Sequence, residues 1–111
     1  MGMLREISEH LQAKARQKKY RLTLHAERER EADLITKQEI EEAILSEQCE
    51  VIEDYPADPR GHSCLILGIT QAGLPIHMVC GHLSEEEFLV ITVYRPDPEQ
   101  WINWRTRKEL S

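Results

Sequence analysis

The first residues that could carry chemistry are a histidine and a tyrosine in neighbouring predicted strands. His77 falls in the middle of a predicted strand at 74–82. The predicted pairing places Gly68 on one side of His77 and Thr92 on the other, with Tyr94 diagonal to it. A neutral imidazole titrates near about pH 6.5, and a tyrosine can donate or hold a proton, so this group could serve acid–base catalysis. The structural alternative is a histidine hydrogen-bonded within the sheet.

A second candidate group is the motif His25-Ala-Glu-Arg28, in a segment of strong helix formers. A spacing of three places the imidazole and the guanidinium on one side of a helix. His25 would lie in the first turn, where the helix dipole favours the neutral ring that a general base needs. The planar guanidinium of Arg28 could donate two hydrogen bonds to a phosphate. In the alternative interpretation His25 packs under a neighbouring leucine, and Arg28 pairs with Glu31 or Asp33.

Basic residues near both ends of the chain could hold a phosphate backbone. Arg95 follows Tyr94 directly and could lie beside the same end of the sheet. The other candidate RNA-binding residues are Arg105, Arg107 and Lys108 in the tail, with Lys18 and Lys19 near the N-terminus. Solvated surface charge is the alternative. Trp101 and Trp104, three residues apart, are expected to anchor the tail on the core.

Two short motifs, His62-Ser-Cys64 and Cys80-Gly-His82, resemble pairs of zinc ligands. The predicted register places Cys64 and Cys80 on opposite faces of the sheet, so the four side chains would not converge. We therefore expect no metal site. We also expect no cofactor, because no glycine-rich phosphate loop or nucleophile elbow is present.

The secondary-structure signals place helices first and strands afterwards. A basic helical segment is predicted within residues 1–21, and Thr36 to Glu39 fits a capping box ahead of a helix that buries Ile40, Ala43 and Ile44. Strands are predicted at 49–54, 63–70, 74–82 and 88–95, and residues 101–109 are compatible with a short helix. A two-residue turn at Ala72-Gly73 would place Leu67 opposite Met78, and the following hairpin would place Met78 opposite Ile91.

This order predicts an α+β domain in which N-terminal helices pack on a curved, mainly antiparallel sheet of about four strands. A length of 111 residues suits a single domain over 1–111, with residues 97–111 as a C-terminal tail. No apolar run approaches the 20 or so residues that a bilayer span needs, and the N-terminus lacks the apolar stretch of a signal peptide. Three cysteines without a C-x-x-C spacing favour a reducing cytoplasm.

The net charge of −6 argues against nucleic acid as a partner, but the charge is segregated along the chain. Residues 1–26 hold six basic and two acidic side chains, a charge of +4. Residues 27–54 hold eleven acidic and three basic side chains, a charge of −8. The acidic segment could therefore face a basic protein while the basic ends meet RNA.

Several of these motifs, taken in order, resemble a prokaryotic family built on a domain of unknown function. They include His25-Ala-x-x-Arg28, Leu74-Pro-Ile-His77 and Thr92-Val-Tyr94-x-Pro-Asp97-x-x-x-Trp101, and the resemblance runs from about His25 to Arg107. Members of that family are often encoded beside zinc-finger antitoxins of the YgiT/MqsA type. The resemblance implies kinship with RelE- and MqsR-like toxins and a RelE-like fold.

If the resemblance extends to function, it implies a type II toxin that cleaves messenger RNA without a metal, alone or on the ribosome. A zinc-finger-type antitoxin would be its protein partner. We expect His77 or His25 as base, Tyr94 as acid, and Arg28 or Arg95 as the cation that stabilises the phosphorane. The alternative is a non-catalytic protein-binding or regulatory domain on the same scaffold. The sequence leaves the oligomeric state open, a homo-oligomer included, and no membrane partner is expected.

Overall fold

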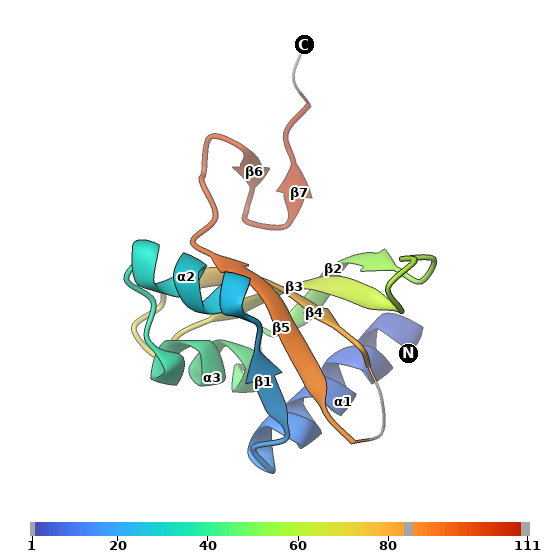
Figure 1. Cartoon of the computed structure of the whole chain (residues 1–111). Helices are drawn as coiled ribbons and strands as arrows, with labels where there is room; N and C mark the ends of the chain where they lie inside the picture. The colour runs from blue at the N-terminus through green and yellow to red at the C-terminus, as the bar shows by residue number, and fades with distance from the viewer. Residues whose placement is uncertain (1, 84–85, 110–111) are drawn as a thin grey trace.

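The computed structural model describes residues 2–83 and 86–109, which form three helices, a five-stranded sheet and a small hairpin (Figure 1). In chain order the elements are α1 (Met3–Arg16), β1 (Tyr20–Leu22), α2 (Leu24–Ala32), α3 (Lys37–Leu45), β2 (Glu50–Tyr55), β3 (Ser63–Ile69), β4 (Pro75–Gly81), β5 (Phe88–Tyr94), β6 (Trp101–Ile102) and β7 (Thr106–Arg107). Within these described ranges, no helix has the length and apolar character needed to cross a membrane.

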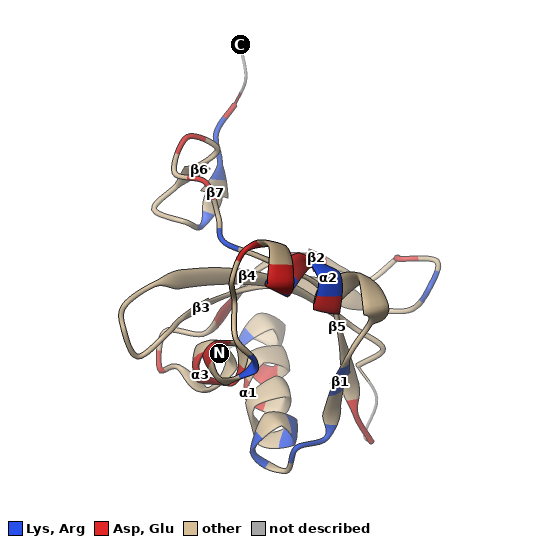
Figure 2. Ribbon diagram, turned by 60° about the vertical axis from the view of Figure 1, so that its left-hand side comes forward, with Lys and Arg blue, Asp and Glu red and all other residues tan. Residues whose placement is uncertain are grey.

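The main sheet has the strand order β1-β5-β4-β3-β2, and the fold is α+β as predicted. The four longer strands are antiparallel neighbours, whereas β1 adds a short fifth strand parallel to β5. Helices α1 and α3 lie under one face of the sheet, and the hairpin β6–β7 lies over the opposite face (Figures 1 and 2). The core fills the space under the first face, where Leu11, Ile44, Ile66 and Met78 have no exposed surface.

The capping box of α3 is confirmed. The Thr36 hydroxyl accepts a hydrogen bond from the Glu39 amide at 3.0 Å, and the Glu39 carboxylate accepts one from the Thr36 amide at 2.9 Å. Helix α2 also begins at a threonine. The Thr23 hydroxyl accepts from the Ala26 amide and donates to the carbonyl of Ile91 in β5, so this cap also joins the start of α2 to the sheet.

Two acidic residues of α2 accept hydrogen bonds from backbone amides along the open edge of β5. Strand β1 pairs with β5 only as far as Val90, which leaves the later amides of that edge without a strand partner. The Glu29 carboxylate accepts from the Val93 amide, and the Asp33 carboxylate accepts from the Arg95 amide, both at 3.0 Å. Helix α2 therefore runs beside β5 as a substitute for the missing strand.

The predicted register of the β3–β4 hairpin is wrong by one residue. The loop has three residues between Thr70 and Leu74, whose backbone groups are hydrogen-bonded at 2.9 Å, and Gly73 adopts a φ of +84°. A three-residue loop with glycine in the left-handed region replaces the expected two-residue turn. As a result Leu67, and not Gly68, lies opposite His77, while Cys64 lies directly opposite Cys80 on the helix-covered face.

The predicted register between β4 and β5 is also wrong. Met78 pairs with Val93 and His77 pairs directly with Tyr94, and a bulge then shifts the pairing after Val79. The expected pairing is therefore off by two residues at His77 and by one residue after the bulge. Tyr94 is therefore the cross-strand neighbour of His77, in the position that the prediction assigned to Thr92.

The tail after Pro96 forms the hairpin β6–β7 in place of the short helix considered for residues 101–109. Trp101 pairs with Arg107 across the hairpin, whose turn holds Asn103 and Trp104 at positive φ angles of 52° and 66°. Trp101 is 4% exposed, because it packs on the sheet face that α1 and α3 leave uncovered. The expected anchoring role of Trp101 is therefore confirmed.

Gly68 sets the contact between the sheet and α3, and replacing it with alanine tests this packing. A Cβ atom at position 68 would lie 2.2 Å from the backbone oxygen of Ala43, too close for either chain segment to keep its place. We expect Gly68→Ala to lower the free energy of unfolding by roughly 1–3 kcal/mol in urea denaturation, because the core becomes overpacked. Gly2→Ala is the matched control, since nothing lies within 4 Å of its added Cβ. Equal urea midpoints for both variants would contradict the packing described.

Candidate functional site

His77 lies at the centre of a hydrogen-bonded group that joins the sheet to the tail. Its side chain has no exposed surface, and both ring nitrogens have partners. Nε2 lies 2.6 Å from the carbonyl oxygen of Trp104, which can only accept, so Nε2 carries a proton. Nδ1 lies 3.0 Å from the Tyr94 hydroxyl, and in the neutral ring it accepts the hydroxyl proton. Tyr94 therefore donates to His77, and His77 donates to the tail.

Aromatic and charged side chains of the hairpin close over this group. The Trp101 ring meets the His77 ring edge-on, with centroids 4.5 Å apart. The Arg107 guanidinium lies 4.7 Å above the Trp101 ring and makes two hydrogen bonds, of 2.7 and 3.1 Å, to the Glu53 carboxylate of β2. In this conformation the tail separates His77 from solvent, so a substrate cannot reach its imidazole.

The protonation states follow from this burial. Burial lowers the pKa of His77, against the opposing effects of the Trp104 carbonyl and the Glu53 carboxylate, so the ring is neutral near neutral pH. Burial likewise raises the pKa of Tyr94, which keeps its hydroxyl protonated. The hydrogen bonds from Arg107 lower the pKa of Glu53, and the same pair raises the pKa of Arg107.

The second predicted pair, His25 and Arg28, lies on α2 and is exposed to solvent. The His25 side chain is 66% exposed, and its Nε2 lies 3.3 Å from the Glu29 carboxylate. The other oxygen of Glu29 accepts from the amide of Val93, the residue before Tyr94. The Glu29 charge also contributes to the raised pKa of Tyr94, after burial. Glu29 therefore connects His25 on α2 to the Tyr94 end of β5.

Arg28 lies one helical turn from His25, and no ion pair involves it within residues 2–83 and 86–109. His25 with its carboxylate partner and the unpaired guanidinium of Arg28 thus lie on α2, beside the strand that carries the Tyr94 hydroxyl. Those three groups can remove a proton, supply one, and offset negative charge.

Arg95, in contrast, is part of the fold. Its guanidinium donates to the carbonyls of Asp33 and Leu34 at 3.1 and 2.9 Å, and it pairs with Glu39 at 3.4 Å. These bonds hold the turn between α2 and α3, where Leu34 adopts a positive φ of 55°. Arg95 therefore points away from any phosphate that would lie on the His25 side of α2.

Most of the predicted RNA-binding cations already have acidic partners. Arg105 is hydrogen-bonded to Glu50 and Lys18 to Glu41. Lys108 lines a shallow pocket beside the two tryptophans, and Lys19 lies on a separate surface with Glu86 and Glu87. Acidic and basic positions are also interspersed along the ribbon of α2 (Figure 2). Much of the acidic middle of the chain is used in these internal pairs.

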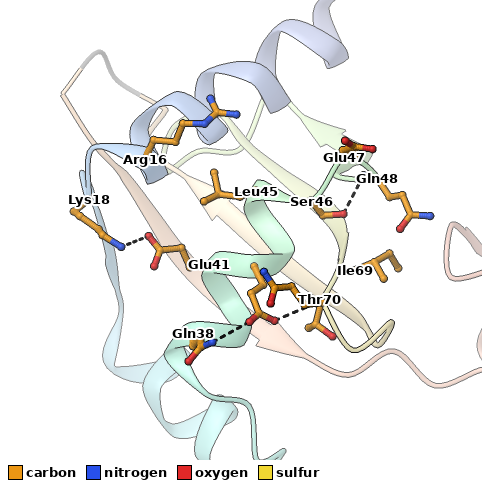
Figure 3. A pocket seen from close by; sticks show the side chains of 12 residues that line it. Arg16, Lys18, Gln38, Glu41, Leu45, Ser46, Glu47, Gln48, Ile69 and Thr70 are labelled. Carbon is orange, nitrogen blue, oxygen red and sulfur yellow. Dashed lines mark hydrogen bonds and ion pairs between the residues drawn. The ribbon is translucent and has the colours of Figure 1, made fainter.

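A pocket of about 670 Å³ lies between the end of α1, α3 and the β3–β4 loop (Figure 3). Its polar groups are bonded to one another: Lys18 to Glu41, and Glu42 to both the Gln38 side chain and the Gln71 amide. None of its lining residues belongs to the His77 or His25 group. This pocket therefore adds no group to either site.

The corrected register brings two cysteines together on the helix-covered face of the sheet. Cys64 and Cys80 are cross-strand neighbours with no exposed surface, and burial raises the pKa of Cys64 to about 12, so the thiols stay protonated. His62 pairs instead with Asp54 at 2.6 Å. In the described part of the chain, no three His, Cys, Asp or Glu side chains are grouped as metal ligands are. The prediction that Cys64 and Cys80 lie on opposite faces of the sheet, which was the reason for expecting no zinc site, is nevertheless wrong.

Three contacts of the site were not predicted from the sequence. Glu29 could have been found, because it lies four residues after His25 on the predicted helix. Glu53 and the carbonyl of Trp104 reach His77 and its cover only through the sheet register and the hairpin, which no local pattern indicated.

These features define a small α+β domain in which His77 and Tyr94 are hydrogen-bonded across neighbouring strands, while His25 and Arg28 lie on the adjoining helix α2. A family model matches residues 22–95, about two thirds of the chain, and the chain belongs to that family, which is described as a domain of unknown function (DUF4258). No curated protein and no solved structure matches the chain. The match includes His25, Arg28, His77 and Tyr94 but ends before the hairpin that covers His77.

The burial of His77 predicts a specific pH dependence. Its lowered pKa means that the unfolded chain binds a proton, from about pH 6.5 downward, that the folded chain does not bind. The free energy of unfolding therefore falls as the pH drops from 7 to 5. We expect His77→Gln, which can still donate to Trp104, to show a smaller fall in urea unfolding across this range. A His77 NMR titration midpoint at or above 6.5 would contradict the burial.

Proposed function

We propose that this protein is a metal-independent endoribonuclease of the RelE- and MqsR-like kind, with His25, Arg28 and Tyr94 as its catalytic residues. The observation that carries the proposal is the link through Glu29, which pairs with the exposed His25 and is bonded to the backbone next to Tyr94. His25 takes the role of base because its side chain is exposed to solvent, whereas the His77 side chain is fully buried under the hairpin β6–β7.

The reaction is the attack of an RNA 2'-hydroxyl on the adjacent phosphorus. The O2'–P bond forms and the P–O5' bond breaks, giving a 2',3'-cyclic phosphate and a free 5'-hydroxyl. His25 removes the 2'-hydroxyl proton, Tyr94 protonates the leaving O5', and Arg28 offsets the added charge of the phosphorane. Glu29 orients the His25 ring, and the Tyr94 hydroxyl, which donates to His77 Nδ1 in the resting structure, turns its hydrogen to the leaving O5' in this step.

The same proposal extends to the cellular setting. A toxin of this kind works in the cytoplasm on free or ribosome-bound messenger RNA, and a zinc-finger-type antitoxin holds it inactive. The family resemblance supports this extension.

A second candidate is a protein-binding domain without catalysis. The paired state of Arg105 and Arg107 favours it, because internal ion pairs reduce the attraction for RNA. Two exposed leucines near the two ends of α2, Leu24 at 65% and Leu34 at 81%, would suit contact with a protein.

The two candidates are separated by incubating the purified chain with RNA in the presence of EDTA, with and without ribosomes. We expect cleavage that leaves 2',3'-cyclic phosphate ends. His25→Asn, Arg28→Gln and Tyr94→Phe should each lower the rate by about 10²- to 10⁴-fold, the usual effect of losing an acid, base or charge-stabilising group.

The matched controls are His82→Asn and Arg60→Gln, which make the same chemical changes on residues outside the α2–β5 junction. They should retain the parent rate. Intact RNA in both reactions, from protein that keeps its helical circular dichroism, would exclude the nuclease and leave the protein-binding domain.

A further inference from the structure

A second pocket, of about 440 Å³, lies along β1 against the start of α3. This volume is within the range of small-molecule sites. Three cationic side chains line it, Lys18, Arg21 and Lys37, against one carboxylate, Glu27. In a chain of net charge −6, a pocket with three basic side chains and one acidic side chain is unusual.

We propose that this pocket binds one nucleotide of a single-stranded RNA, with the phosphate on its cations and the base on its apolar floor. The inference rests on the proposed function, because it supplies the substrate contact that the His25 group lacks.

The floor of the pocket is apolar and partly aromatic. Its accessible part consists of Tyr20 and Leu22 from β1, and the fully buried Ile40 of α3 lies beneath them. Tyr20 is half-buried and stacks on Phe88 with a centroid separation of 5.5 Å, so its ring is held in place. A base that packs on a fixed apolar and aromatic surface gains affinity with little dependence on its identity.

The cations on the rim can exchange their present partners for a phosphate. Lys18 pairs with Glu41, Arg21 with Glu87, and Lys37 with Glu27, and their side chains are 71%, 69% and 64% exposed. Exposed ion pairs contribute about 0–1 kcal/mol each, so little stability is lost when one of them opens. Phosphate oxygens then accept from the released ammonium and guanidinium groups.

Strand β1 also offers polar backbone groups to the ligand. The Lys19 carbonyl and the Thr23 amide are bonded to β5, so the backbone groups of the alternate residues, Tyr20 and Leu22, turn away from the sheet. These groups line the pocket side of an edge strand and can pair with the polar edge of a base.

The position of the pocket agrees with a strand that continues to the proposed catalytic residues. On α2, Glu27 lies on the flank that borders the pocket. Helical spacing turns Arg28 outward next to it and carries His25 to the far flank, beside Glu29. An RNA strand that leaves the pocket and crosses α2 would meet Arg28 first and His25 second.

The test measures binding to a 2'-O-methyl oligonucleotide, which cannot be cleaved because its 2'-oxygen is blocked. Fluorescence anisotropy compares the full chain with the double variant Arg21→Glu and Lys37→Glu. The control double variant, Arg5→Glu and Arg60→Glu, makes the same change in net charge on exposed residues outside the pocket. We expect at least tenfold weaker binding for the pocket variant, with the control near the parent. The salt dependence of binding should flatten by about 0.7 in logarithmic slope for each phosphate that the variant no longer neutralises.

Equal effects of the two double variants would overturn the pocket, because binding would then follow net charge alone. A preference of the parent chain for a poly-glutamate peptide over the oligonucleotide would also overturn the proposal, because it would assign the pocket to an acidic protein. Pocket-dependent binding without cleavage of ordinary RNA would contradict the proposed nuclease and retain the nucleotide site.

Discussion

The carboxylates of Glu29 and Asp33, bonded to the free edge of β5, hold α2 and its candidate residues His25 and Arg28 beside the strand that carries Tyr94. Strand β1 is too short to cover that edge, and each uncovered amide in a partly buried position would cost about 1–3 kcal/mol without a partner. Helix α2 supplies the partners from its side chains, so it must run beside β5. This placement brings His25 and Arg28, one turn apart on α2, to the strand that carries Tyr94. The acidic character of α2 is thus a requirement of the fold as much as a surface property.

His77 plays a different part from the one its residue type suggests. It connects the Tyr94 hydroxyl to the carbonyl of Trp104, and Arg107 and Glu53 close the same junction from outside. The charge of the chain has a similar explanation. The acidic middle segment caps β5, caps α3 and pairs with the basic tail, so the formal −6 describes a surface on which opposite charges are paired. Local groups of cations then matter more for an RNA partner than the total does.

Local signals in the sequence predicted the helices and the fold class well, and long-range geometry less so. Thr36 and Glu39 specify the start of α3 because both partners of the capping box lie within one turn. The β3–β4 register depended on a single residue in a loop, and the β4–β5 register, two residues off at His77, contains a bulge; neither leaves a clear pattern, so Gly68 and Thr92 were wrongly placed beside His77. Tyr94 was correctly grouped with His77 despite those errors. The hairpin was missed because its turn uses Asn103 and Trp104 where glycine is usual at positive φ.

Amide hydrogen exchange at Val93 and Arg95 tests the central claim most directly, because it reports whether α2 holds the edge of β5. The account predicts slow exchange at both amides in the parent chain, comparable with the amides shared by β4 and β5. In Glu29→Ala, protection should fall at Val93, while Arg95 keeps its partner in Asp33. Rapid exchange at Val93 in the parent chain, or protection that is unchanged in Glu29→Ala, would contradict the placement of α2 and with it the proposed grouping of His25, Arg28 and Tyr94.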